Sequence, residues 1–190
     1  MTVTEDSRVK KTKQKLFAAY LRLLTKKAPA DITIQLLTKE ADINRVTFYK
    51  HFQHIANFHD AFVLHYLEEL YTFMKPLNYK TYAKGFEYDA LLDLLNHLKN
   101  HASTYKVLLT SPYIKEFNQH LLVFFQKKIM QHTTELAKLE FPGTNVDQVI
   151  VSWYGVSALF GTIIMWVQSD YPFSPEQLAK SIVKLSPHAS

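Results

Sequence analysis

The chain has 190 residues, of which 47% are hydrophobic and 14% aromatic, and this composition excludes intrinsic disorder because it supplies ample material for a packed core. It contains four glycines, seven prolines and no cysteine. So few helix breakers, together with few alternating apolar and polar runs, indicate an all-α protein. The lack of cysteine excludes disulfides and thiolate metal sites, and it is compatible with the cytoplasm, where we expect the protein to act.

The net charge of +5 is unevenly placed along the chain. Residues 1–60 hold eleven Lys and Arg against six Asp and Glu, whereas residues 61–190 hold eleven of each. A phosphate backbone needs a basic face only on the module that touches it, so this split favours a nucleic acid as partner of the N-terminal part. A solvated basic tail is the alternative. The basic arm at residues 1–10 has no apolar core, so it is not a signal peptide.

Residues 8–27 are predicted to form an amphipathic helix, which Ala28-Pro29-Ala30 ends. Its first turns hold several lysines, which the helix dipole disfavours unless a phosphate lies nearby. The apolar stripe of this helix consists of Leu16, Tyr20, Leu23 and Leu24.

Two short helices are predicted over residues 34–40 and about 45–51. Thr33 suits the N-cap of the first, and Asn44, at the end of the turn Asp42-Ile43-Asn44, suits the N-cap of the second. This is the outline of a helix-turn-helix, whose second helix enters the major groove of DNA.

The second short helix is oriented by two phenylalanines that lie four residues apart, Phe48 and Phe52, which we expect to face the core. Val46 and Lys50 then point away from the core. Apolar side chains there suit thymine methyls, arginine suits guanine, and tyrosine, lysine and histidine suit phosphate oxygens. An equally good interpretation is that Tyr49 merely packs on the third helix of this region, the long helix that follows. The predicted DNA-binding residues are Thr33, Asn44, Arg45, Val46, Thr47, Tyr49, Lys50 and His51.

The run from Leu37 to Phe52, LTKEADINRVTFYKHF, resembles the DNA-binding signature of the TetR family of transcriptional regulators, most specifically over its last six residues. The resemblance covers about 50 residues, from the first helix to the start of the fourth. Asp42 stands where the family usually has glycine, but aspartate tolerates a left-handed conformation better than most residues do. Thr38 replaces a usual alanine. Ile55-Ala56 replaces a usual Lys-Glu pair, and this chain therefore lacks a lysine that the family commonly directs at phosphate.

A long helix is predicted over residues 55–74, followed by a boundary loop over 76–86. The helix would link two domains: 1–54, which binds DNA, and 55–190, which senses a ligand and dimerises. Further helices are predicted over 87–101, 103–110, about 112–139 after Ser111-Pro112, about 145–169 with Asn145 and Gln148 as a capping box, and 175–185 after Ser174.

Residues 149–167 carry no charge for 19 positions, which is long enough for a transmembrane helix. No basic cluster flanks either end, and serine, glycine and alanine form patches that let another helix approach closely. We therefore favour a helix buried between two copies of the chain over a membrane span. The resemblance implies the same arrangement, a homodimer that forms through helices at about 146–169 and 175–185.

No motif for enzymatic chemistry, a metal or a cofactor is evident. His97 and His101 have the spacing of a metal pair, but a third ligand is lacking, and a neutral surface pair is the better interpretation. Several aromatic residues of the second domain form its core or line a site for an apolar or aromatic effector, and no buried charge is evident to orient one.

The sequence thus predicts an all-α protein with an N-terminal helix-turn-helix three-helix unit and a C-terminal helical bundle that forms a dimer. We expect it to bind a palindromic operator in double-stranded DNA and to repress transcription until an effector tilts the helix beginning near Ile55. One alternative is a regulator of similar fold whose bundle binds a protein partner in place of a metabolite, as an activator or adaptor. A membrane-anchored regulator is another.

Overall fold

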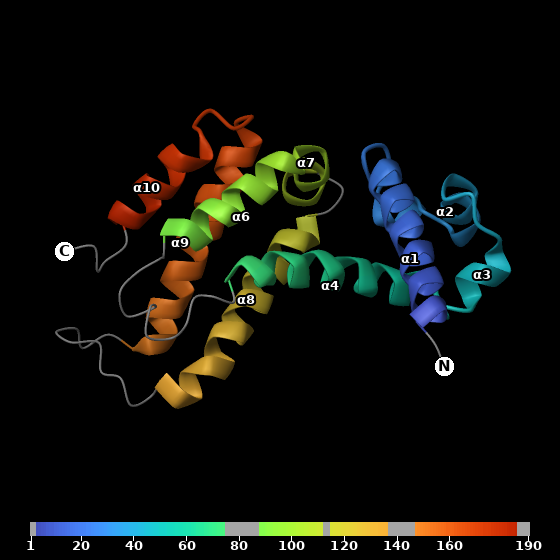
Figure 1. Ribbon diagram of the computed structural model, residues 1–190, viewed down its shortest axis with the longest axis horizontal. Helices are drawn as coiled ribbons and strands as arrows, with labels where there is room; N and C mark the ends of the chain where they lie inside the picture. The colour runs from blue at the N-terminus through green and yellow to red at the C-terminus, as the bar shows by residue number, and fades with distance from the viewer. Residues whose placement is uncertain (1–2, 75–87, 112–114, 137–146, 186–190) are drawn as a thin grey trace.

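The computed structural model describes residues 3–74, 88–111, 115–136 and 147–185, and no strand occurs among them (Figure 1). The all-α class is confirmed. The elements are α1 (Val3–Leu24), the short 3-10 helix η1 (Pro29–Asp31), α2 (Ile34–Glu40), α3 (Arg45–Tyr49), α4 (Ile55–Met74), α6 (Tyr88–Asn100), α7 (Ala102–Thr110), α8 (Lys115–Leu136), α9 (Gln148–Gln168) and α10 (Pro175–Leu185).

The predicted bounds of α2, α4 and α10 agree with the structure, and the other helices differ at one or both ends, α6 and α7 by one residue at an end. Helix α1 begins at Val3, ahead of the predicted residue 8, and α3 ends at Tyr49, two residues before the predicted end at His51. Helix α8 begins at Lys115. The predicted cap at Ser111-Pro112 falls partly on 112–114, and the predicted loops at 76–86 and 141–144 fall wholly outside the described residues.

The start of α9 differs from the prediction in its cap. Asp147 is the N-cap, and its side chain accepts a hydrogen bond from the Val149 amide at 2.8 Å, so Gln148 is the first helical residue and not a capping-box partner of Asn145. A capping box does form at α10. The Gln177 amide donates to Ser174 Oγ at 3.2 Å, and the Ser174 amide donates to Gln177 Oε1 at 3.0 Å.

Helix α4 connects the two parts of the molecule. Figure 1 shows it running from the α1–α3 unit on the right to the bundle of α6–α10 on the left. Its first half carries Phe58 and Phe62, both fully buried, whose rings pack on Phe17 and Tyr20 of α1 with centroids 4.8 to 5.6 Å apart. Its second half packs on α6 and α8. Helix α4 therefore contributes to the core of both parts.

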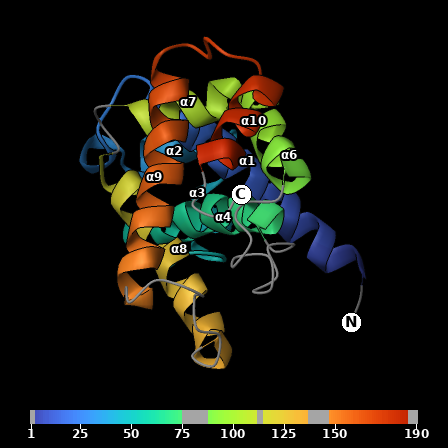
Figure 2. The ribbon, with the colours of Figure 1, turned by 90° about the vertical axis from the view of Figure 1, so that its left-hand side faces the viewer.

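The bundle is a layered stack of helices around one apolar core. Helix α10 packs on α6, and α9 packs on both α7 and α8; Figure 2 shows α8 and α9 side by side. The aromatic residues predicted for this part divide between core and surface, because Trp153 and Tyr154 of α9 face solvent. The fully or nearly fully buried aromatic residues are Tyr105, Phe117, Phe125, Phe160 and Trp166.

We predict that Phe58→Ala lowers the free energy of unfolding of the protein by about 3–5 kcal/mol, because the change leaves a cavity inside the ring cluster between α1, α3 and α4. Urea denaturation followed by circular dichroism, at fixed protein concentration, measures the loss. Leu64→Ala is the matched control on the same helix. Leu64 is exposed, so its truncation is expected to cost about 0.5 kcal/mol or less. Equal losses in the two variants would contradict the assignment of Phe58 to the core.

Candidate nucleic-acid interface

The turn between α2 and α3 has the left-handed geometry for which the family usually employs glycine. Asp42 has φ of 52°, and the amide of the next residue, Ile43, donates to the carbonyl of Thr38 at 3.0 Å. Aspartate is among the few residues that tolerate this conformation. Thr38, buried where the family usually has alanine, donates its hydroxyl to the Ile34 carbonyl at 2.8 Å, so the extra polar group has a partner.

Both predicted N-caps form. Thr33 Oγ1 accepts from the Leu36 amide at 3.2 Å, and Asn44 Oδ1 accepts from the Val46 amide at 2.9 Å. Each side chain is exposed and still has donor capacity: the hydroxyl hydrogen of Thr33 and the amide group of Asn44. The caps fix where α2 and α3 begin, and the same side chains stand at the solvent edge of the unit.

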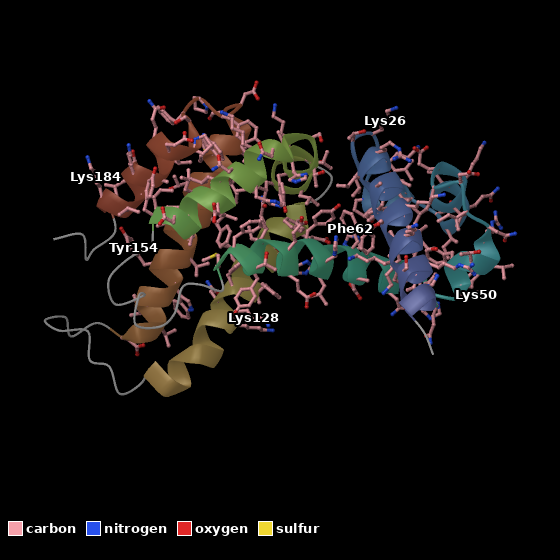
Figure 3. All side chains as sticks on the ribbon, viewed as in Figure 1. Lys26, Lys50, Phe62, Lys128, Tyr154 and Lys184 are labelled. Atoms are coloured by element: carbon pink, nitrogen blue, oxygen red, sulfur yellow. The ribbon has the colours of Figure 1, made fainter. Side chains whose placement is uncertain are left out.

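The outward face of α3 is the one that the two phenylalanines predict. Phe48 and Phe52 are buried, whereas Val46 is 63% exposed and Tyr49 is 56% exposed. Tyr49 therefore stands mostly in solvent, which disfavours its packing on the helix that follows, and its ring makes an edge contact with that of Phe48, with the centroids 5.8 Å apart. Lys50 is exposed as well and lies at the right-hand end of the molecule in Figure 3.

The remaining predicted residues lie around this face. Arg45, at the start of α3, is exposed, and Thr47 and His51 are half-buried on its flanks. The eight residues predicted from the sequence thus come from the caps of two helices and from α3 with the residues just after it, within one continuous stretch of the fold. Their contact with DNA stays a prediction.

Helix α1 adds Lys13, one of the lysines in its first turns, which the eight predicted DNA-binding residues do not include. The Lys13 ammonium lies over the Phe52 ring, 5.9 Å from its centroid, which places a cation from α1 beside the end of the recognition region. The lysines in the first turns of this helix were the signal, and the stripe that carries Leu16 and Tyr20 also includes position 13. Lys13 is exposed and is free to reach a phosphate from this position.

Arg22 fixes α1 against the end of α2. Its Nε donates to Glu40 Oε1 at 2.6 Å, and its Nη2 donates to the Glu40 carbonyl at 3.1 Å. The two bonds hold one guanidinium to both the side chain and the backbone of a residue in the last turn of α2. Both side chains are substantially exposed, so the pair contributes to geometry more than to stability.

Helix α9 presents an apolar face to solvent at the opposite end of the molecule. Tyr154 is 68% exposed and Trp153 is 52% exposed, and Figure 3 places Tyr154 far from Lys50. Between the large side chains lie small ones, which leave the helix backbone open to close approach. The exposed positions of this face are Ile150, Trp153, Tyr154, Ser157, Ala158, Gly161, Thr162 and Met165. Among the described residues, no helix is apolar over enough of its length to span a membrane.

A half-buried polar cluster joins α4, α6 and α7. The sequence alone gave no sign of a buried charge in this part of the chain. His97 Nε2 lies 3.3 Å from Glu69 Oε1 and 3.0 Å from the hydroxyl of Tyr105. The His97 side chain is only 13% exposed, so the prediction of a surface pair is wrong for His97, although His101 is exposed and its ring lies tilted against that of His97 with the centroids 4.6 Å apart. No group of three potential metal ligands is found in the part of the chain that the structure describes.

The pKa values in this cluster follow its burial. Burial lowers the pKa of His97; the Glu69 carboxylate opposes this and the neighbouring His101 adds to it. Burial, and then the charge of Glu69, raise the pKa of Tyr66 to about 12 and that of Tyr105 further. The cluster thus holds a neutral imidazole and neutral phenols beside one carboxylate at neutral pH.

Comparison with protein families gives a match over the second part of the chain. A family model described as the C-terminal region of a transcriptional regulator, of the TetR type, matches residues 87–188, which is more than half of the chain. No curated protein matches the sequence.

Solved structures with the same fold cover nearly the whole chain. A TetR transcriptional regulator from Streptococcus agalactiae 2603V is 17% identical, with 97% of this chain and 98% of that chain covered and a TM-score of 0.66. NalD, the secondary repressor of the MexAB-OprM multidrug efflux pump in Pseudomonas aeruginosa, is 18% identical over 95% of this chain and 94% of its own, with a TM-score of 0.64. DhaS, an activator of a dihydroxyacetone kinase operon, is 20% identical over 92% and 93%, with a TM-score of 0.57. At these identities the likeness is one of fold.

We predict that His97→Gln flattens the dependence of stability on pH. Because burial lowers the pKa of His97, the unfolded chain, whose histidines titrate near about 6.5, binds this proton more readily than the folded chain does. As the pH falls below about 6.5, the wild type therefore loses stability that the variant retains. His59, whose pKa is also lowered by burial, leaves part of the slope in the variant.

Thermal unfolding at fixed protein concentration, between about pH 7.5 and pH 5.5, measures this slope. The exposed His54 provides the control, because His54→Gln is expected to keep the slope of the wild type. A slope that is equal in wild type and His97→Gln would contradict the role assigned to burial.

Proposed function

This chain belongs to the TetR family of transcriptional regulators, and we propose that it acts as a homodimer that represses transcription from a palindromic operator until an effector releases it. The family match makes the chain a DNA-binding transcriptional regulator. The proposal further specifies which residues contact DNA, how two copies associate, and that the protein represses transcription and does not activate it.

The exposed face of α3 is the observation that carries the DNA-binding part of the proposal. Two buried phenylalanines hold the helix so that Val46 and Tyr49 stand out into solvent, with Arg45 and Lys50 on the same short element. Such a combination suits base edges at the centre and phosphates at the rim. We assign residues 1–54 to DNA binding and residues 55–190 to sensing and dimerisation, with α4 as the link.

The apolar face of α9 supports the dimer. A helix that exposes tryptophan, tyrosine and methionine on one side in a single copy leaves a large apolar surface in water, and such surfaces mark association sites. A two-fold partner that places its own α9 against this one would cover it, with the small residues allowing close approach. Helix α10 extends the same interface over residues 175–185.

A small molecule is the effector that we propose, because the bundle combines a dense aromatic core with the polar cluster at Glu69 and His97. An effector shifts the protein only by binding the two orientations of α4 with different affinity. Repression follows from a dimer that occupies an operator and blocks polymerase. A bundle that binds a protein partner is the second candidate, and co-purification of a partner that alters DNA affinity would favour it.

We predict that Lys50→Ala and Tyr49→Ala each weaken binding to the operator upstream of the gene by about tenfold or more, because each removes a group that meets phosphate. Gel shifts at about 150 mM salt measure the affinity. For Lys50→Ala, the slope of log affinity against log salt is also expected to fall by about one for each lost phosphate contact.

Lys99→Ala is the matched control for this prediction. Lys99 is an exposed lysine of α6, in the bundle and outside the proposed dimer interface, and its loss is expected to leave affinity and salt slope unchanged. Equal binding by Lys50→Ala and the wild type would contradict the assignment of the recognition face. An affinity that does not change with salt would contradict the electrostatic account.

We predict that Tyr154→Glu disrupts the dimer, because it places one carboxylate from each copy in an apolar interface where nothing compensates the charge. The dissociation constant of the dimer is expected to rise by about 100-fold or more, as measured by analytical ultracentrifugation. Leu64→Glu makes the same kind of change at an exposed apolar position on α4 and is expected to leave the dimer intact. A Tyr154→Glu variant that dimerises like the wild type would exclude α9 as the interface.

A further inference from the structure

Three helices meet around one histidine in the first half of α4. The Tyr20 hydroxyl, from α1, lies 2.9 Å from Nδ1 of His59 on α4. Tyr20 is only 1% exposed, and its ring packs edge-on against the rings of His59, Phe58 and Phe62. Helix α8 adds Glu116 and His120, which act electrostatically on His59. The site therefore joins the DNA-binding unit, the linking helix and the bundle.

The charges that face His59 come from two of these helices. Burial lowers the pKa of its imidazole, Asp60 of α4 and Glu116 of α8 raise it, and His120 of α8 lowers it. Burial and the charge of Glu116 raise the pKa of Tyr20 far above its usual value, so the phenol keeps its single hydrogen at every pH of interest. Glu116 thus acts on both members of the Tyr20–His59 pair.

Protonation of His59 changes which groups at this site donate hydrogen bonds and which accept them. In the neutral ring, Nδ1 either accepts the Tyr20 hydrogen or donates its own, according to the tautomer. In the imidazolium, both ring nitrogens donate, so the Tyr20 hydroxyl must accept and its hydrogen must find another acceptor in nearly dry surroundings. The new positive charge is at the same time attracted to the Glu116 carboxylate on α8. Protonation therefore favours a different arrangement of α1, α4 and α8.

We propose that His59, through its hydrogen bond with Tyr20 and its electrostatic interaction with Glu116, is a positioning residue that sets how the DNA-binding unit is held on the bundle, and that a proton on His59 lowers operator affinity. The inference rests on the proposed function, since it concerns the geometry with which the dimer presents two copies of α3. A fixed junction holds the two units in one orientation before DNA binds. If the junction loosens, part of the binding free energy is spent on ordering the two units, and the affinity falls. The proton is thus a second input, independent of any effector.

Operator affinity at about pH 8 and about pH 6 tests this role in three variants. His59→Asn places an amide where Nδ1 lies and does not titrate, so it is expected to bind within about twofold of the wild type at the higher pH and about three- to tenfold better than the wild type at the lower. Tyr20→Phe removes only the hydroxyl and is expected to bind about three- to tenfold more weakly than the wild type at the higher pH. His65→Gln, an exposed histidine on the same helix, is expected to follow the wild type at both.

A readout without DNA separates this inference from the proposed function. The ring resonances of His59, followed by NMR against pH, are expected to titrate at a lower pH in Glu116→Gln than in the wild type, because Glu116 raises the pKa of His59. A wild type that binds no operator contradicts the proposed function. Two results contradict the inference while the proposed function stands: DNA-binding curves of His59→Asn that parallel those of the wild type across pH, or an unchanged midpoint in Glu116→Gln.

Discussion

The packing of one side chain, Phe58, holds α1, α3 and α4 of this regulator together. Its ring contacts the rings of Phe17 and Tyr20 from α1, those of Phe48 and Phe52 from the recognition region, and that of Phe62 from its own helix. Because protein interiors are close-packed, these rings leave no freedom for α3 to turn independently of α4. The proposed DNA-reading face is therefore a property of three helices held by one cluster. A tilt of α4, as proposed for the response to an effector, would carry α3 with it.

The same packing continues along α4 into the bundle. The ring of Phe62 contacts that of Tyr66, Tyr66 contacts Tyr105 of α7, and Tyr105 contacts His97 of α6. The apolar cluster between α1, α3 and α4 is thus continuous with the polar cluster between α4, α6 and α7. Contact alone does not make a switch, because a switch requires an element with two arrangements that both sites bias. Helix α4 is the element placed to have them, since its first half packs on α1 and its second half on α6.

The helices and the outward face of α3 could be predicted from the sequence because they depend on local signals. The contacts between residues far apart in the sequence could not. Two phenylalanines four residues apart oriented α3, and Ser174 ahead of a proline opened α10, because both depend on neighbours within one or two turns. The cap of α9 was misplaced because Asn145 and Asp147 are equally good caps by residue type. The pair of Tyr20 and His59 is separated by 39 positions and joins two different helices, so no periodicity reveals it. The contacts of His97 were missed for the same reason, since Glu69 lies on another helix.

The two sides of α9 have different surroundings, and each accounts for the absence of charge from residues 149–167. One side buries Val156, Phe160 and Ile163 against the bundle, while the other exposes Trp153 and Tyr154. A charge on the inner side would be buried without a partner, and a charge on the outer side would oppose the proposed association of two copies. If two copies join along that outer side, the bundle, α4 and α3 of each copy form one continuous packed path. The spacing of the two reading faces is then set by the angle of α4 in each copy. Modest movements of that helix suffice to change it, because the distance from the interface to α3 spans the long axis of the molecule (Figure 3).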